Sequence, residues 1–182
     1  MLKKIILIFI LGTGVISCFC DEIVPFWNVK DIEISFLNDD KVLITSDSIS
    51  ADSLNVIVDF DIDYVAEISF QNLFINSAMA TQPCPVNGDE GMKDAINNIT
   101  LTANDKYNNF AAGASLNEIV QYFGEEGFEK FVNSIGSYPA IPSFDFHIME
   151  KPTNLDSVKF TVQLDFVSGN SISKESDYIF WK

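Results

Sequence analysis

The amino-acid sequence predicts a mainly β protein, an antiparallel immunoglobulin-like β-sandwich with a helical insertion. Several short segments alternate apolar and polar residues with the period of two that half-buried strands require. One region alone, near 115–136, repeats apolar residues at helical spacing. An α+β fold, in which these helices pack on one face of a sheet, is the alternative that the same pattern leaves open.

The first half of the chain contains the clearest predicted strand. Over 54–65, apolar residues alternate with three aspartates, so one face should point inward and the other to water. Alternation over 29–36 predicts an earlier strand, and a turn before 42–45 predicts the start of another. The apolar segment 68–75 is compatible with a strand, and 99–102 predicts a short one. These segments together favour a sheet of several strands.

The helical insertion is predicted from a capping box. Ser115 and Glu118 have the Ser-x-x-Glu spacing of a helix N-terminus, and Gly124 marks a stop. A second helix would carry apolar residues at helical spacing, namely Phe128, Phe131, Val132 and Ile135. We therefore expect two short helices within 115–136, docked on the sheets.

Three further strands are expected after the helices, over 144–149, 158–167 and 173–181. Ser168, Gly169 and Asn170 predict a tight hairpin between the last two. Sixteen phenylalanines are enough for a sizeable aromatic core.

The N-terminus has the features of a secretory signal. Lys3 and Lys4 precede the apolar run 5–11, which is too short to cross a bilayer. Val15, Ile16, Ser17 and Cys18 follow, and this tetrapeptide resembles a bacterial lipobox. The resemblance implies cleavage before Cys18 and lipidation of its sulfur; an ordinary signal peptide with an incidental cysteine is the alternative. The predicted division is a signal peptide over 1–17, a lipidated tether over 18–27 and one β-rich domain over 28–182.

The charge of the chain argues against a nucleic-acid partner. The formal net charge is −15, all eleven basic residues are lysine, and there is one histidine. A nucleic-acid partner is excluded because a protein that binds nucleic acid requires a basic face.

The acids Asp21 and Glu22, just after the lipidated cysteine, resemble the surface-export signal of Bacteroidota lipoproteins. That resemblance implies the outer membrane, on the cell surface, with the periplasmic leaflet as the alternative.

Two cysteines remain beside Cys18. Cys20 and Cys84 would meet an oxidising compartment, which predicts a disulfide between them, with two free thiols as the alternative. The bridge would close a loop of about 65 residues, worth roughly 4 kcal/mol in the chain-entropy model. Two cysteines without histidine partners cannot form a structural zinc site.

The candidate chemistry is sparse. Asp59, Asp61 and Asp63 share a strand face and are candidate Ca²⁺ ligands, although a strand spreads ligands that a calcium loop would converge, so a solvated face is the alternative. His147 lies beside Asp145, but the chain has no Gly-x-Ser-x-Gly motif, and the sequence indicates neither a catalytic residue nor a cofactor.

Three serines stand in Asp-Ser-aliphatic tripeptides: Ser48, Ser53 and Ser157. The tripeptide resembles the acceptor of Bacteroidota O-glycosylation, which implies modification of these side chains. Ordinary turn and strand-edge chemistry is the alternative, because Asp and Ser both favour turns.

The segment 99–123 also resembles small Bacteroidota lipoproteins of a domain family without an assigned function. Ile99–Ala103, Asn109, Phe110 and Ala112–Asn117 carry the resemblance. It brings no catalytic residues. We therefore expect a membrane-anchored, non-enzymatic binding or structural module for a glycan or protein, with a carboxylate-based hydrolase of an extracellular glycan as the alternative.

Overall fold

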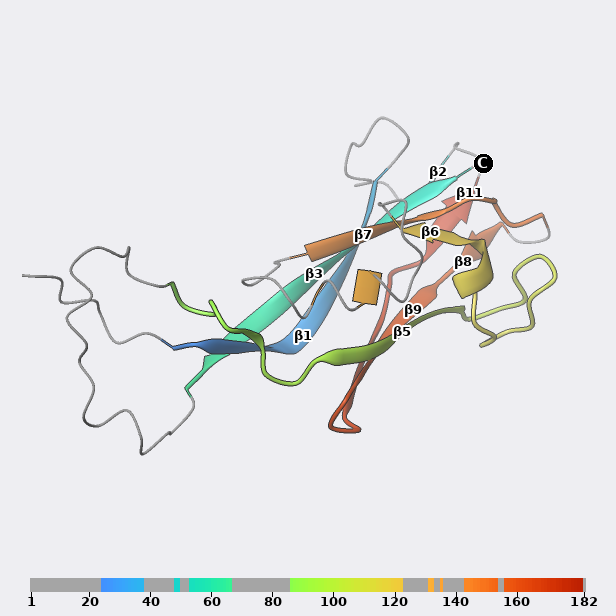
Figure 1. Ribbon diagram of the computed structural model, residues 1–182. Coiled ribbons are helices and arrows are strands. Elements are labelled where there is room, and N and C mark those ends of the chain that lie inside the picture. The colour runs from blue at the N-terminus through green and yellow to red at the C-terminus, as the bar shows by residue number, and fades with distance from the viewer. Residues whose placement is uncertain are drawn as a thin grey trace, which may run out of the picture.

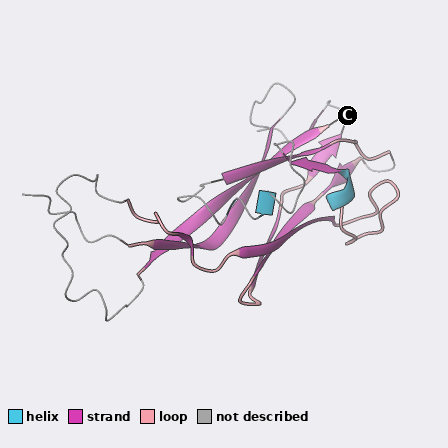
Figure 2. Cartoon of the chain, in the orientation of Figure 1, coloured by secondary structure: helices cyan, strands magenta, loops and turns pink. Residues whose placement is uncertain are grey.

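The computed structural model describes residues 24–37, 48–49, 53–66, 86–122, 131–132, 135, 143–153 and 156–181. Within these residues the protein is mainly β, and two short helical pieces interrupt the strands (Figures 1 and 2). The strands form three sheets.

The largest sheet has five strands in the order β4-β1-β3-β7-β6. All its pairs are antiparallel except β1 with β4, which is parallel. The strands are β1 (Phe26–Leu37), β3 (Leu54–Val65), β4 (Gly91–Met92), β6 (Val120–Tyr122) and β7 (Ser143–Ile148).

Two smaller sheets complete the described part. The order β10-β9-β5 is fully antiparallel, whereas in β2-β11-β8 strand β11 runs parallel to β2. The strands are β2 (Ser48–Ile49), β5 (Ile96–Ala103), β8 (Ser157–Val158), β9 (Phe160–Phe166), β10 (Ser171–Glu175) and β11 (Ile179–Trp181).

Strand β3 covers the predicted range, and its apolar residues face the core while its aspartates face water, as predicted. Val56 and Val58 are buried, and the aspartates that follow at alternate positions point outward. Tyr64 departs from the pattern, since its side chain is half exposed. Here the loop over 86–90 lies against the strand, with Gly88 close to the Tyr64 ring.

Strand β1 contains a bulge that the sequence pattern hides. The register with β3 shifts between Val29 and Asp31, so Lys30 is an extra, exposed residue. Because a bulge reverses side-chain parity, Trp27 and Ile32 both point into the core although they are five residues apart. Trp27 lies within the predicted tether range 18–27 but is fully buried, so the domain already includes the start of β1.

The predicted helix that begins at Ser115 is wrong. Ser115 forms an isolated bridge with Thr102, a 3₁₀-helix η2 (Asn117–Ile119) follows, and the chain then enters β6. The Ser115 hydroxyl accepts a bond from the backbone N–H of Asn117, but the capping box closes no α-helix. Pairing of β6 with β7 takes the backbone groups that a helix would have used.

A helical insertion is therefore not seen in the described part of the chain, where only three residues of the second predicted helix are described as helical. These are Phe131, Val132 and Ile135, which come from the second predicted helix. Val132 and Ile135 are buried, and the Phe131 ring packs edge-on against Phe144 with centroids 5.4 Å apart. These three side chains thus contribute to the core.

The last two predicted strands are each divided in the structure. The range 158–167 spans β8 and β9, and 173–181 spans β10 and β11. Ser176 lies at the second break: its N–H donates to Phe160 O, and its hydroxyl accepts from Phe160 N. The hairpin between β9 and β10 is confirmed, with Gly169 at φ +90°. The predicted strands 42–45 and 68–75 lie outside the described residues.

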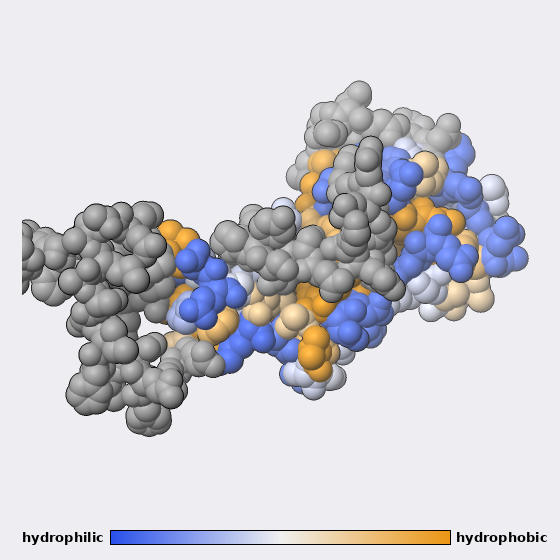
Figure 3. Space-filling model, viewed as in Figure 1, coloured by the Kyte–Doolittle hydropathy of each residue, from blue (hydrophilic) through white to orange (hydrophobic). Residues whose placement is uncertain are grey.

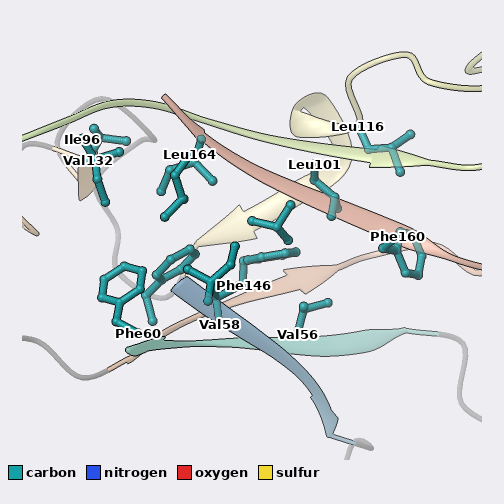
Figure 4. Packing of buried hydrophobic residues seen from close by; sticks show 14 of the residues in the cluster. Val56, Val58, Phe60, Ile96, Leu101, Leu116, Val132, Phe146, Phe160 and Leu164 are labelled. Atoms are coloured by element: carbon teal, nitrogen blue, oxygen red, sulfur yellow. The ribbon is translucent and has the colours of Figure 1, made fainter. Parts of the chain in front are cut away.

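One apolar cluster joins the five-stranded sheet to the sheet β10-β9-β5. Val56, Val58, Phe60 and Phe146 point from one sheet toward Leu101, Phe160 and Leu164 from the other (Figure 4). Aromatic contacts reinforce this cluster: the rings of Phe36 and Phe160 lie 6.3 Å apart, and those of Phe60 and Phe144 lie 5.5 Å apart.

Candidate functional site

The predicted calcium candidates lie on the outer face of the β1–β3 pair. Asp59, Asp61 and Asp63 are exposed and follow one another along β3. Asp59 stands opposite Glu33 and Asp61 opposite Asp31, so like charges face each other across the strands. Among the described residues no three histidine, cysteine or carboxylate side chains are grouped as metal ligands. The structure thus places the three candidates in a row along an exposed strand face.

Two lysines offset part of this negative charge. Lys30 Nζ lies 3.7 Å from Asp61 Oδ2, and Lys174 Nζ lies 3.1 Å from Asp31 Oδ2. The backbone N–H of Ile32 and then the Lys174 ammonium hold the pKa of Asp31 below its ordinary value. A general acid in a hydrolase needs a raised pKa instead, so Asp31 is unsuited to that role.

His147 is positioned by an amide rather than by a catalytic partner. Its Nδ1 lies 2.6 Å from Asn55 Oδ1, and Gln121 is its cross-strand neighbour on β6. Asn55 is only 7% exposed although it belongs to the outer face of β3. In the part of the chain that the structure describes, no serine, cysteine or carboxylate bonds to this imidazole. Asn55 and His147 therefore cross-link β3 and β7.

An exposed aromatic pair lies at and just before β11. Tyr178 is 47% exposed and Phe180 is 42% exposed, and their ring centroids are 6.3 Å apart with a tilt of 38°. The Lys159 ammonium lies 4.8 Å from the Tyr178 centroid and 2.6 Å from Glu175 Oε1. Bonding to Glu175 raises the pKa of Lys159, so the ammonium stays charged beside the ring.

Alternation along the last strand places these rings outside. Ile179 is buried, and Trp181 packs edge-on against Phe160 with centroids 6.4 Å apart. The alternate residues Tyr178 and Phe180 therefore point away from the core. Sequence reasoning missed the pair because both faces of 178–181 are apolar. Only the position of the core distinguishes the exposed face from the buried one.

Two of the predicted acceptor serines, Ser48 on β2 and Ser157 on β8, are register partners of Phe180 in the central strand β11. Register partners share a sheet face, so the Ser157 side chain, which is half-buried, neighbours the Phe180 ring. The third serine, Ser53, lies just before β3.

The cysteines Cys18, Cys20 and Cys84 lie outside the described residues, and the described part contains no disulfide. The sequences that follow Cys20 and Cys84 are nevertheless joined. Gly88 N–H donates to Val24 O at 2.8 Å, and Val24 N–H donates to Asn87 Oδ1 at 3.0 Å. Cys20 is four residues before Val24, and Cys84 is four residues before Gly88.

Comparison of the chain with protein-family models, curated proteins and solved structures finds no match. A search of the described residues for a helix of sufficient length and hydropathy to span a bilayer also finds none.

Proposed function

We propose that the chain is a lipid-anchored envelope protein whose β-sandwich binds a neutral glycan through Tyr178 and Phe180, without enzymatic activity. Lipidation at Cys18 would hold it on the outer membrane, at the cell surface or, as the alternative, in the periplasmic leaflet. One observation carries the proposal. The exposed aromatic pair belongs to the end of the molecule that carries β11, far from the start of β1, where the described chain begins (Figure 1).

The shared core supports an immunoglobulin-like sandwich as the scaffold. Apolar side chains of β3 and β7 face those of β5 and β9, as the two inner faces of a sandwich do (Figure 4). A sandwich presents the loops and strand ends at its poles as binding surfaces on a rigid support. Tyr178 and Phe180 occupy such a position.

The chemistry of the pair suits a sugar ring. One face of a pyranose presents C–H groups to an aromatic ring, while its hydroxyls require hydrogen-bonding groups at the periphery. Tyr178 and Phe180 supply two adjacent ring surfaces, and aromatic residues that combine an apolar body with a polar tip are typical of binding surfaces. Ser157 and Lys159 provide polar groups beside them.

The negative net charge of the chain favours a neutral glycan over an acidic one as the ligand. The chain carries −15, which repels polyanions such as acidic polysaccharides over the range set by ionic strength. The Lys159 ammonium at the pair is already bonded to Glu175.

The hydrolase alternative receives no comparable support. A glycosidase needs two carboxyls that flank the substrate, at a separation set by the reaction's stereochemistry. The described acids of β1 and β3 instead line an exposed strand face, and the pKa of Asp31 is lowered.

Affinity electrophoresis tests the proposal. The Cys18→Ala protein would be run in native gels containing soluble neutral polysaccharides: an α-glucan, a β-glucan, a mannan and a xylan. We expect one of them to retard the protein. The double variant Tyr178→Ala, Phe180→Ala should bind it at least about tenfold more weakly, a loss of about 1.4 kcal/mol or more.

Tyr64→Ala is the matched control, because Tyr64 is also 47% exposed but lies on β3. It should bind as the parent protein does. Retardation that is equal in the double variant and the parent would contradict a site at Tyr178 and Phe180. A failure of every neutral polysaccharide to retard the protein would reject the glycan and favour a protein ligand.

A further inference from the structure

Three segments meet where the described chain begins, and we call this region the tether pole. It comprises the start of β1, the end of β3 and the loop over 86–90 (Figure 1). Phe26 pairs with Val65 of β3 on one side and with Gly91 of β4 on the other. Glu90 N–H donates to Pro25 O at 2.9 Å, so the loop is fastened to the chain that leads into β1.

The tether pole exposes apolar side chains on a rigid support. Val86 is 61% exposed and Tyr64 is 47% exposed, and hydrophobic residues are visible at this end of the molecule in Figure 3. The Tyr64 ring is held in place by close packing: a Cβ on Gly88 would lie 3.1 Å from Tyr64 Cε1 and 3.0 Å from Trp27 Cδ1. Exposure here is therefore a property of a packed surface.

We infer that the tether pole rests on the lipid surface, with Tyr64 and Val86 in the interfacial layer. This inference depends on the lipid anchor of the proposed function. Val24 is the sixth residue after Cys18, and an extended chain spans at most about 3.6 Å per residue. A lipid on Cys18 would thus keep Val24, and the side chains beside it, within about 20 Å of the bilayer surface.

The side chains of the tether pole are chemically suited to contact with a lipid surface. Tyrosine is enriched at membrane interfaces, where its ring meets the headgroups. Lys93 is exposed and its Nζ lies 6.0 Å from the Phe26 ring centroid, so a short movement could carry the ammonium to lipid phosphates while its stem covers apolar surface.

Charge determines which lipid is favoured. The exposed acids Asp89 and Glu90 belong to the loop of the pole, and exposed Asp63 lies near the end of β3. Anionic headgroups would repel all three. We therefore expect contact with zwitterionic lipid, weakened when anionic lipid is added.

Site-directed spin labelling of the lipidated full-length protein tests the inference. Single cysteines would replace Tyr64, Val86 or, as the matched control, Tyr178, in a background with Cys20→Ser and Cys84→Ser. Tyr178 has the same 47% exposure as Tyr64 but lies beside β11. Each protein would be reconstituted into phosphatidylcholine vesicles, and collisions of the label with oxygen and with a water-soluble nickel complex would be compared.

We expect an oxygen-to-nickel collision ratio several-fold higher at positions 64 and 86 than at position 178. Equal ratios at all three positions, in protein that stays on the vesicles, would overturn the inference and leave the anchor intact. Release of the protein from vesicles together with an unmodified Cys18 would instead reject the anchor, and the inference with it. Val86→Cys keeps the test valid if Tyr64→Cys disturbs the packing on Gly88.

Discussion

Gly88 is the residue on which the packing of the tether pole depends most directly. It adopts φ +80°, and a Cβ would press on the Trp27 and Tyr64 rings. Gly88→Ala should therefore lower the free energy of unfolding by about 1–3 kcal/mol, since left-handed strain and a steric clash both act. Urea unfolding of the parent and the variant measures this difference.

Gly113→Ala is the matched control for that prediction. Gly113 has φ +73°, but a Cβ added to it would meet no atom within 4 Å, so only the backbone strain applies. The substitution should cost about 1 kcal/mol, less than Gly88→Ala. An equal decrease in the free energy of unfolding of the two variants would show that the Trp27 and Tyr64 rings can move aside without loss of stability.

Asp31 should make stability depend on acid pH. The Ile32 N–H and the Lys174 ammonium lower its folded-state pKa below the ordinary 3.8. A lowered folded pKa contributes stability above the unfolded value, and this contribution disappears as the pH falls through the folded value. The stability difference between the parent and Asp31→Asn should thus be constant from pH 7 to about pH 5 and should shrink below about pH 4.

Lys174→Met removes one of the groups that lower this pKa and leaves the Ile32 N–H and Lys30, so it should reduce the same pH dependence only in part. Denaturant unfolding of all three proteins at several pH values measures it. A difference between the parent and Asp31→Asn that does not change with pH would contradict the assignment.

At the scale of the elements, the bulge in β1 decides which side chains reach the core. Deletion of Lys30 should remove the bulge, so that Trp27 and Ile32 can no longer point to the same side of β1. Either Trp27 and Val29, or Ile32 and the inward side chains after it, would then face water. Exposing such side chains costs about 1.5–3 kcal/mol each, so the deletion should abolish cooperative unfolding or nearly so.

Lys30→Ala retains the bulge and serves as the control. Because Lys30 is exposed, its substitution should change the free energy of unfolding by less than about 0.5 kcal/mol. Both effects can be read from thermal unfolding followed by circular dichroism. A deletion as stable as Lys30→Ala would show that β1 changes register without loss.

Asn117 stabilises β5, the edge strand of its sheet, because its side chain bonds to backbone groups of β5 as a neighbouring strand would. Its side-chain oxygen accepts from Leu101 N at 3.0 Å, and its amide nitrogen donates to Ile99 O at 2.7 Å. Asn117→Ala leaves two backbone groups without this partner and should cost about 1–3 kcal/mol. Asn117→Asp keeps the acceptor alone and should lie between the parent and Asn117→Ala in urea unfolding. An Asn117→Ala variant as stable as the parent would show that water replaces the amide.

The same elements show how far sequence reasoning reaches. Strand β3 could be predicted because its alternation faces one core throughout. The Ser115–Glu118 pattern failed because strand pairing between β6 and β7 outweighs local helix propensity. The aromatic pair at Tyr178 and Phe180 could not be predicted, since the sequence does not reveal which apolar face the core covers.

At the scale of the whole molecule, the tether pole favours a disulfide between Cys20 and Cys84. The hydrogen bonds of Val24 with Asn87 and Gly88 align the two sequences in parallel, with each cysteine four residues upstream. We expect a non-reducing peptide map of exported protein to find the two cysteines joined. Reduction should lower the free energy of unfolding by about 2–4 kcal/mol. Two free thiols in that map would contradict the bridge.

The orientation of the molecule depends on its attachment at residue 18. If that residue carries the lipid, we expect the tether pole to face the membrane and the end of the molecule that carries β11 to face away from it (Figure 1). Several acyl chains give stable anchoring that a single chain does not. Without the lipid, neither the proposed display of the aromatic pair nor the membrane contact of the tether pole has a physical basis.

Membrane fractionation of cells that express the parent or Cys18→Ala, with mass spectrometry of the mature N-terminal peptide, tests this most directly. The account predicts that the parent sediments with membranes and begins at an acylated Cys18. It predicts that Cys18→Ala becomes soluble after export. A Cys18→Ala protein that still partitions into membranes, or a parent N-terminus without acyl groups, would contradict it.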